Sequence, residues 1–384
     1  MRVLLQLCLQ FSAYWMKTFV WILNAILMHF ILIGKPLAQD NVQEKAYQYH
    51  VGINGLRGFL QPHNEEVRHL TYGRPTGFEL HFNKKTLGSE AWQNRFNRPD
   101  IGFSLTYFNT DMEPTGHLIA GLAYMEFYLI RTRFGSFTFR AASGLTYATK
   151  TYDRETNNLN TVISSRLTYS MQGRFGFHIP VTDRWTFYPS ATFSHASNGS
   201  LKLPNAGINI VSANVGLTYS FSEVSLPEKP GEEEPLEKRF HVNMLISGAA
   251  KELYPTGGPK YGYWTIRTYF DKPLSRVSRL VGGIDYIMNG AKKEQIRRKK
   301  ELSDKIDYKR IGLIIGHELT VSKVSVMTQF GYYVYRPFRG DDDPDYYQRY
   351  GLKYYITEEL FATAMLKTFI GRADTFDFGI GIRL

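Results

Sequence analysis

Short segments that alternate apolar and polar residues recur along most of this chain of 384 residues. Successive side chains of a β-strand point to opposite faces, so each such segment has one apolar face and one polar face. Repeated segments of about ten residues are the signature of an antiparallel transmembrane β-barrel. We therefore predict an all-β fold of this kind. The clearest segments are Ile101–Tyr107, Leu118–Tyr124, Phe137–Ala141, Leu167–Met171 and Phe376–Leu384.

The polar faces of the expected strands carry charged residues, among them Arg140, Arg166, Arg174 and Arg383. In a soluble β-sandwich, one face of every strand is buried in a core between two sheets. Arginine is costly in such a core unless it is paired. The pattern therefore favours a barrel with a polar interior over a sandwich.

The connections between the expected strands alternate between long and short for most of the chain, as they do in outer-membrane barrels. Residues 223–238 are acidic and rich in proline, a composition typical of a linker. The strands could form one barrel of roughly 14–16 strands, or two tandem barrels of about eight strands each. A single closure is the simpler way to leave no open sheet edge in a membrane, and it is the one we expect.

The first 38 residues have the pattern of a secretory signal peptide, with a single transmembrane anchor as the alternative. Lys17 precedes an apolar run over residues 18–33, and Pro36-Leu37-Ala38 could end at a signal peptidase site. Met16, directly before Lys17, is an alternative start of translation. The expected organisation is a signal peptide (1–38), a first barrel half (39–222), a linker (223–238) and a second half without a catalytic motif (239–384).

The only cysteine, Cys8, lies in the predicted signal peptide, so the mature chain would have no thiol for catalysis, disulfides or metal binding. The formal net charge is +11. In an exported protein this charge favours an anionic glycolipid surface over nucleic acid as the partner.

A candidate site lies where two expected strands flank a loop rich in Gly, Pro and Asn, in residues 185–221. His195 and Ser197 continue the apolar face of the first strand, and Asn209 begins the corresponding face of the second. A base, a hydroxyl and an orienting amide on an apolar surface point to acyl-ester chemistry at a lipid layer. By spacing alone, however, a His-x-Ser pair is more often an ordinary polar strand end.

The loop supplies candidate binding groups. Asn198, Asn205 and the backbone amides around Gly199 could donate to a developing oxyanion. Lys202 could contact a lipid phosphate, although a solvated lysine is the alternative.

The run from His195 to Ile208 reads His-Ala-Ser-Asn-Gly-Ser-Leu-Lys-Leu-Pro-Asn-Ala-Gly-Ile. It resembles the active-site segment of the outer-membrane lipid A 3-O-deacylases, an acyloxyacyl hydrolase-like family. The resemblance covers about Tyr47–Phe221 and is strong only from Phe187 onward. It implies an eight-stranded barrel with the motif on its last two strands, whereas the second half has no counterpart in the short members of the family.

The resemblance implies that Ser197 is the nucleophile and His195 the general base, in hydrolysis of the acyl ester at the 3 position of lipid A without a metal or other cofactor. The family has a glutamate directly after the Gly-Ile pair, where this chain has Asn209. An amide can orient the imidazole but cannot offset the charge that the ring acquires.

The sequence thus predicts a serine esterase of the bacterial outer membrane that acts on lipid A of lipopolysaccharide at the outer leaflet. The alternative is a non-catalytic barrel, either a pore or a structural protein with a decayed site. The esterase requires His195, Ser197 and Asn209 to face membrane lipid at the cell-exterior end of neighbouring strands, because a site facing the lumen would not meet the acyl esters.

Overall fold

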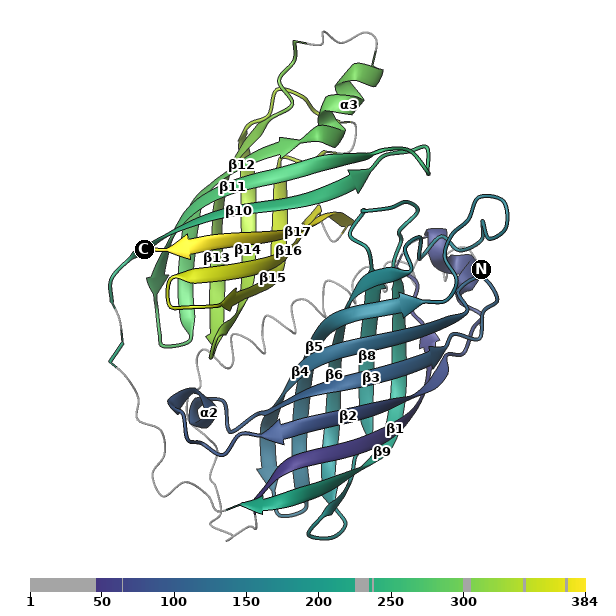
Figure 1. Ribbon diagram of the computed structural model, residues 1–384, viewed down its shortest axis with the longest axis vertical. Coiled ribbons are helices and arrows are strands. Elements are labelled where there is room, and N and C mark those ends of the chain that lie inside the picture. Colours follow the sequence, from purple (N-terminus) through teal and green to yellow (C-terminus); the bar gives the residue numbers. More distant parts are fainter. Residues whose placement is uncertain are drawn as a thin grey trace, which may run out of the picture. The chain divides into compact units, whose positions relative to one another are not determined.

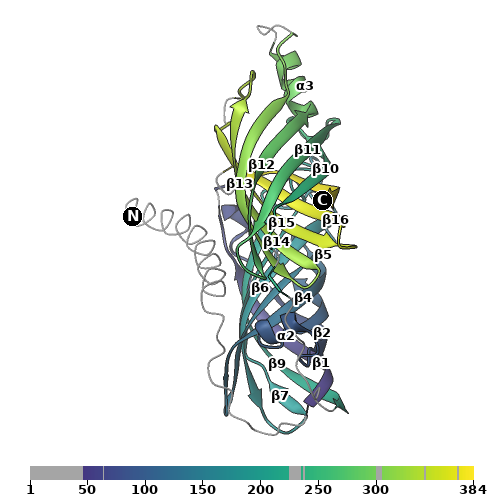
Figure 2. The same cartoon turned by 90° about the vertical axis from the view of Figure 1, so that its left-hand side faces the viewer.

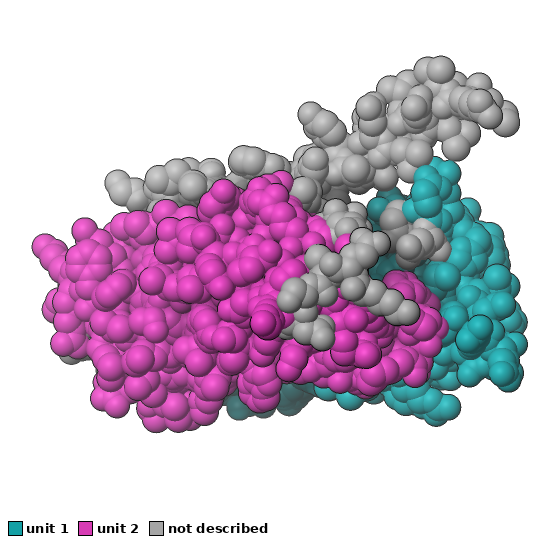
Figure 3. Space-filling model, turned by 90° about the horizontal axis from the view of Figure 1, so that it is seen from above, with its two compact units in different colours: residues 1–197, 205–233 teal, residues 198–204, 234–384 magenta. Residues whose placement is uncertain are grey.

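The protein folds into two compact units, which Figure 3 shows in different colours. The computed structural model describes residues 46–63, 65–224, 235–236, 238–299, 305–340, 343–369 and 372–384. The predicted signal peptide and most of the predicted linker lie outside these residues. The first unit comprises the described part of residues 1–197 and 205–233, and the second comprises the described part of residues 198–204 and 234–384. None of the described helices is long and apolar enough to cross a membrane.

The first unit is an antiparallel sheet that closes on itself, because β9 pairs with β1 and places Leu217 opposite Ile53 (Figure 1). Both β7 and β8 pair with β6 and β9, so they fill one position. Residues 46–63 and 65–224 contain nine strands. Because β7 and β8 occupy the same position between β6 and β9, the closed sheet has eight positions. The strands are β1 (Ala46–Leu60), β2 (Thr76–Lys85), β3 (Asp100–Asn109), β4 (His117–Thr132), β5 (Gly135–Ala148), β6 (Leu167–Pro180), β7 (Trp185–Phe187), β8 (Ser190–Ser197) and β9 (Ile208–Val224).

The second unit is a closed barrel of eight strands within the described part of residues 238–384 (Figures 1 and 2). It closes through β10 and β17, where Ile246 lies opposite Ile380. A short helix, α3 (Gly290–Arg298), follows β12 directly. The strands are β10 (His241–Glu252), β11 (Lys260–Pro273), β12 (Ser278–Asn289), β13 (Arg310–Val321), β14 (Val324–Tyr335), β15 (Tyr346–Tyr355), β16 (Leu360–Phe369) and β17 (Arg372–Arg383).

The chain therefore adopts the tandem arrangement and not the expected single barrel of roughly 14–16 strands. A single barrel would have paired β9 with β10 and β17 with β1. Instead, β9 pairs with β1 over 14 residue positions from Ala46–Val224 to Leu60–Ile210, and β10 pairs with β17. In each half, the first and last strands pair with each other, so neither sheet has an open edge. The prediction of a closed barrel is therefore confirmed, whereas the expected number of barrels was wrong.

The strands present an apolar outer face and a polar interior, as the alternation predicted. On β2, Phe78, Leu80 and Phe82 are 46–47% exposed, whereas the intervening Glu79 and His81 are 0% and 4% exposed. A band of exposed apolar side chains around a closed sheet is what a lipid environment requires. The exposure pattern therefore confirms the outward apolar face on strands such as β2 and β3, where Ile101 and Phe103 are 43% and 53% exposed. On β4 the prediction was wrong. The apolar series Leu118, Ala120, Leu122 and Tyr124 is buried inside the barrel at 1–4% exposure, because both faces of this strand are largely apolar.

Ion pairs fill the middle of the first barrel. Glu79 accepts hydrogen bonds from Arg174 Nη1 at 2.6 Å and from Arg140 Nη1 at 3.1 Å. Arg140 also pairs with Glu126, with 2.8 Å between its Nη2 and Glu126 Oε2. All four side chains are almost completely buried. The second barrel has a comparable interior, in which Arg267 pairs with Asp285, Arg349 with Asp377 and Lys353 with Glu318.

One end of the first barrel is closed by apolar packing. The loop after β1 includes a 3₁₀ helix, η1 (Glu65–Leu70), which contributes Val67 and Leu70 to a cluster of buried side chains. The strands and other loops contribute Leu56, Leu60, Phe108, Met112, Leu118, Ala148, Val162, Ile163, Ala196, Ile208 and Ile210. This cluster supports the ends of β8 and β9 from the inside.

The same end of the first barrel carries its longer loops, residues 61–75, 110–116, 149–166 and 198–207. The opposite end has short turns at residues 133–134 and 181–184, together with a longer connection at 86–99 that contains α2 (Ala91–Arg95). The His-x-Ser hairpin lies at the long-loop end, where several loops can surround it.

Candidate active site

The predicted site residues lie on the hairpin formed by β8 and β9. In the register of this hairpin, His195 lies directly opposite Asn209. Ser194, Ala196, Ile208 and Ile210 are buried on the interior side of the sheet. Since side chains alternate along a strand, His195, Ser197 and Asn209 belong to the outer face. The same outer face of β9 continues into Val215 and Leu217, which are 58% and 44% exposed.

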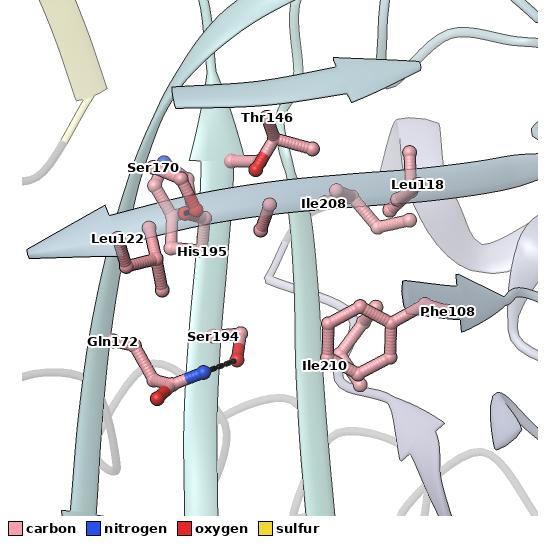
Figure 4. A pocket seen from close by; sticks show the side chains of 12 residues that line it. Phe108, Leu118, Leu122, Thr146, Ser170, Gln172, Ser194, His195, Ile208 and Ile210 are labelled. Carbon is pink, nitrogen blue, oxygen red and sulfur yellow. Dashed lines mark hydrogen bonds between the residues drawn. The ribbon is translucent and has the colours of Figure 1, made fainter. Parts of the chain in front are cut away.

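A small cavity lies on the interior side of the hairpin (Figure 4). Apolar side chains such as Phe108, Leu118 and Ile208 line most of it. On its polar side, Gln172 donates a hydrogen bond to the Ser194 hydroxyl at 3.2 Å, as Figure 4 shows. His195 borders this cavity, and its main-chain carbonyl accepts a hydrogen bond from the Ser170 hydroxyl at 3.0 Å. The cavity is thus part of the packing behind the hairpin.

His195 and Asn209 are joined by a short hydrogen bond, with 2.6 Å between His195 Nδ1 and Asn209 Oδ1. A carboxamide oxygen can only accept, so the proton of this bond is on His195 Nδ1. The second ring nitrogen, Nε2, then carries a lone pair. A histidine in this tautomer can take a proton from a hydroxyl group.

A third residue, His63, completes the arrangement. It lies in the loop after β1, and its Nδ1 is 3.0 Å from Asn209 Nδ2. Its Nε2 is 2.7 Å from the main-chain oxygen of Ala206. His63 is not among the predicted site residues, because it lies 146 positions before Asn209 in a loop without a recognisable motif.

Gly207 lies next to both the imidazole of His195 and the side chain of Ser197. It has a φ of +80°, and a Cβ atom added there would lie 2.9 Å from His195 Cε1 and 3.2 Å from Ser197 Cβ. The side chain of any other residue at position 207 would therefore contact both His195 and Ser197. The backbone is held there by hydrogen bonds from Gly207 N to Val162 O at 3.0 Å and from Ala206 N to Thr161 O at 3.1 Å.

The remaining predicted residues lie in the loop between β8 and β9. Asn198 is 8% exposed, and its amide donates to the main-chain oxygen of Lys202 at 3.0 Å, which closes the loop. Gly199 has a φ of +61°. Lys202 and Asn205 are half-buried. Ser197 and Asn209 are 8% and 5% exposed, so the site is sheltered although it belongs to the outer face.

Two family models match the chain, one in each barrel. Residues 76–218 match the model described as lipid A 3-O-deacylase (PagL). Residues 240–384 match the model described as acyloxyacyl hydrolase, C-terminal domain, so the second half has a counterpart that the short family members lack. None of the curated proteins matches the chain.

Solved outer-membrane barrels are similar only at low identity. Neisserial surface protein A has 10% identity and a TM-score of 0.33, and the match covers 45% of this chain and 97% of that one. Outer membrane protein Omp33 of Acinetobacter baumannii has 10% identity and a TM-score of 0.16, with 89% and 99% covered. The toluene transporter TodX of Pseudomonas putida has 8% identity and a TM-score of 0.16, with 92% and 91% covered.

Proposed function

Because this chain belongs, through residues 76–218, to the lipid A 3-O-deacylase family, we propose that it is a serine esterase with Ser197 as its nucleophile. The family match already gives a bacterial outer-membrane protein that hydrolyses acyl esters of lipid A. The proposal adds the mechanism, the residues and the leaflet. The observation that supports it most directly is the 2.6 Å hydrogen bond between His195 and Asn209 beside Ser197 on the outer face of the barrel.

The proposed reaction has two steps. Ser197 Oγ attacks the carbonyl carbon of the ester while His195 Nε2 takes the hydroxyl proton. The tetrahedral intermediate collapses to an acyl-serine, and the His195 proton passes to the oxygen of the departing sugar alcohol. Water then attacks the acyl-serine with the same histidine as base, which releases the fatty acid and restores Ser197.

The other predicted residues have supporting roles in this scheme. Asn209 holds the His195 ring in the tautomer that exposes the Nε2 lone pair. The backbone amides near Asn198 and Gly199, with the side chain of Asn205, supply donors for the oxyanion. Lys202 is the candidate contact for a lipid A phosphate.

The position of the hairpin suits a substrate embedded in the membrane. The site belongs to the outer face at the long-loop end of the barrel, and outer-membrane barrels carry their longer loops on the cell exterior. Lipid A would then meet the site in the outer leaflet without leaving the membrane.

The interior of the first barrel argues against the alternative of a passive pore. Apolar packing that includes Leu60, Phe108 and Ile210 closes the long-loop end, and the buried pairs of Glu79 with Arg140 and Arg174 occupy the middle. A pore would require a continuous water-filled path through both regions.

The test of the proposed function is incubation of the purified protein with lipopolysaccharide in detergent, followed by mass spectrometry of the lipid A. We expect lipid A to lose one ester-linked hydroxyacyl chain, with one hydroxy fatty acid released per lipid. A protein-free incubation controls for spontaneous hydrolysis. Lipid A that keeps all its acyl chains under these conditions would exclude the esterase.

Substitution of Gly207 is expected to impair catalysis more than folding. The Gly207→Ala side chain would press against His195 and Ser197 and separate them, and a displacement of about 1 Å costs roughly a hundredfold in rate. The turnover number on lipopolysaccharide, measured beside the urea midpoint of unfolding, checks this. Gly257→Ala is the matched control, since Gly257 has a φ of +83° and a Cβ there meets no described atom within 4 Å. Full activity of Gly207→Ala would contradict the proposed closeness of the two catalytic groups.

Replacement of Asn209 by glutamate is expected to leave the deacylation rate equal or higher. A carboxylate orients the imidazole as the amide does and also stabilises the imidazolium that forms during proton transfer. Initial rates of fatty acid release from both proteins, at equal concentrations of folded barrel, give the comparison. A large loss would show that Asn209 has a specific role that a carboxylate cannot fill.

A further inference from the structure

We infer that His63 is a positioning residue, which holds Asn209 in the one amide orientation that makes His195 a base. This inference rests on the proposed esterase function and extends it to a residue in a different loop. The structure brings His63, Asn209 and His195 into one hydrogen-bonded row, with 3.0 Å between the first two and 2.6 Å between the last two.

An asparagine in this position has a weakness that a carboxylate lacks. The two oxygens of a carboxylate are equivalent, whereas an amide has one oxygen that accepts and one nitrogen that donates. If Asn209 turned its nitrogen toward His195, the ring would have to accept at Nδ1 and carry its proton on Nε2. His195 could then no longer take the proton of Ser197. The wrong tautomer of a catalytic histidine is very costly in serine hydrolases.

His63 removes this ambiguity through its own contacts. Its Nε2 lies 2.7 Å from the carbonyl oxygen of Ala206, which can only accept, so His63 carries its proton on Nε2. In the neutral ring, Nδ1 is then an acceptor. Asn209 must direct its Nδ2 donor toward that nitrogen, which leaves Oδ1 for His195. The tautomer of His195 is thus set by a chain of hydrogen bonds that runs from the Ala206 carbonyl through His63 and Asn209.

The carbonyl that starts this row is itself anchored. Ala206 N donates to Thr161 O at 3.1 Å, and Gly207 N donates to Val162 O at 3.0 Å. These bonds fix the peptide units on either side of Ala206 to the loop between β5 and β6. Three separate segments of the first unit, residues 61–75, 149–166 and 205–207, therefore cooperate to orient one imidazole.

Substitutions at position 63 test the inference by kinetics. His63→Phe keeps a flat ring but offers no hydrogen bond, and we expect it to lower kcat roughly tenfold while KM changes less than about twofold. His63→Gln provides one acceptor and one donor on a planar group and should recover most of the lost kcat. His69→Phe is the matched control, because His69 lies in the same loop and its Nε2 is 2.7 Å from the main-chain oxygen of Leu159, away from Asn209. It should stay within about twofold of the unsubstituted protein.

A more specific test is to introduce His63→Phe into the Asn209→Glu variant. A carboxylate needs no partner to choose between its oxygens, so His63→Phe should cost less than about twofold there. Equal losses in the two backgrounds would overturn the inference, as would a Gln variant that is as slow as the Phe variant. Either result would reduce His63 to an ordinary packing residue.

A spectroscopic readout separates this inference from the proposed function. Nitrogen NMR of histidine-labelled protein distinguishes the two imidazole tautomers and does not depend on activity. We expect His195 protonated at Nδ1, and a mixture of tautomers after His63→Phe. If that variant leaves the His195 tautomer unchanged, the inference is wrong even in an active esterase. If the tautomer responds but the unsubstituted protein releases no fatty acid, the proposed function alone is wrong.

Discussion

Replacement of Ser197 by alanine is expected to reduce lipid A deacylation by roughly 10⁴-fold or more. The substitution removes the oxygen that would form the acyl-enzyme, and His195 and Asn209 are then left with no group to activate. Hydrolysis that persists would depend on water attacking the ester directly. Mass spectrometry of lipid A after prolonged incubation, with released hydroxy fatty acid quantified in parallel, measures the residual rate.

Ser194→Ala is the matched control for this substitution. Ser194 lies on the same strand, three residues earlier, but its hydroxyl is directed to the interior, where it accepts from Gln172. Loss of that neutral hydrogen bond should affect stability slightly and leave the turnover number within about twofold. Substantial activity in Ser197→Ala, with Ser194→Ala also active, would remove Ser197 as the nucleophile while leaving the family's reaction to other residues.

Where only one face of a strand is apolar, as on β2, the outward face could be predicted from the alternation of residues alone. On β4, where both faces are largely apolar, the alternation did not show that Leu118 and Leu122 lie inside. Phe78 and Leu80 lie outside and Glu79 lies inside, whichever strands pair with β2. The same rule placed His195 and Asn209 on one face, and the register then set them directly opposite each other. A local pattern is sufficient for such predictions, since each depends only on neighbours two positions away.

The number of barrels could not be predicted in this way. The strands of one large barrel and of two small ones have the same alternation and similar lengths. What decides between them is whether β9 pairs with β1 or with β10, a choice between partners far apart in the sequence. Ile53 lies opposite Leu217, but no local sequence pattern around either residue indicates this pairing.

His63 was missed for a related reason. A histidine in a polar loop is most often a surface residue, and the sequence of residues 61–75 does not distinguish His63 from His69. Its role depends on the closure of the first barrel, which brings the end of β1 beside the start of β9, with Leu60 opposite Ile210. The departure from the family pattern at Asn209 was visible in the sequence, but the residue that compensates for it was not.

Replacement of Glu79 by alanine is expected to destabilise the first barrel by about 3–5 kcal/mol. Glu79 is completely buried and accepts from both Arg140 and Arg174, and also from Asn54 Nδ2 at 3.1 Å. Arg140 would keep its pair with Glu126, whereas the partners that Arg174 would retain among the described residues, such as Thr192, are neutral. The cost arises mainly from leaving a buried guanidinium without a counter-charge, which neither the barrel wall nor lipid can solvate.

Urea unfolding of the detergent-solubilised barrel, followed by tryptophan fluorescence, measures this loss. Glu113→Ala is the matched control, because Glu113 pairs with Lys150 at the exposed surface and its removal should leave the midpoint unchanged within error. The double substitution Glu79→Leu with Arg174→Met should recover much of the stability, since apolar groups of similar size can replace a buried ion pair. An unchanged midpoint for Glu79→Ala would mean that water reaches Arg174. The barrel interior would then be open to water, which would favour the alternative of a passive pore.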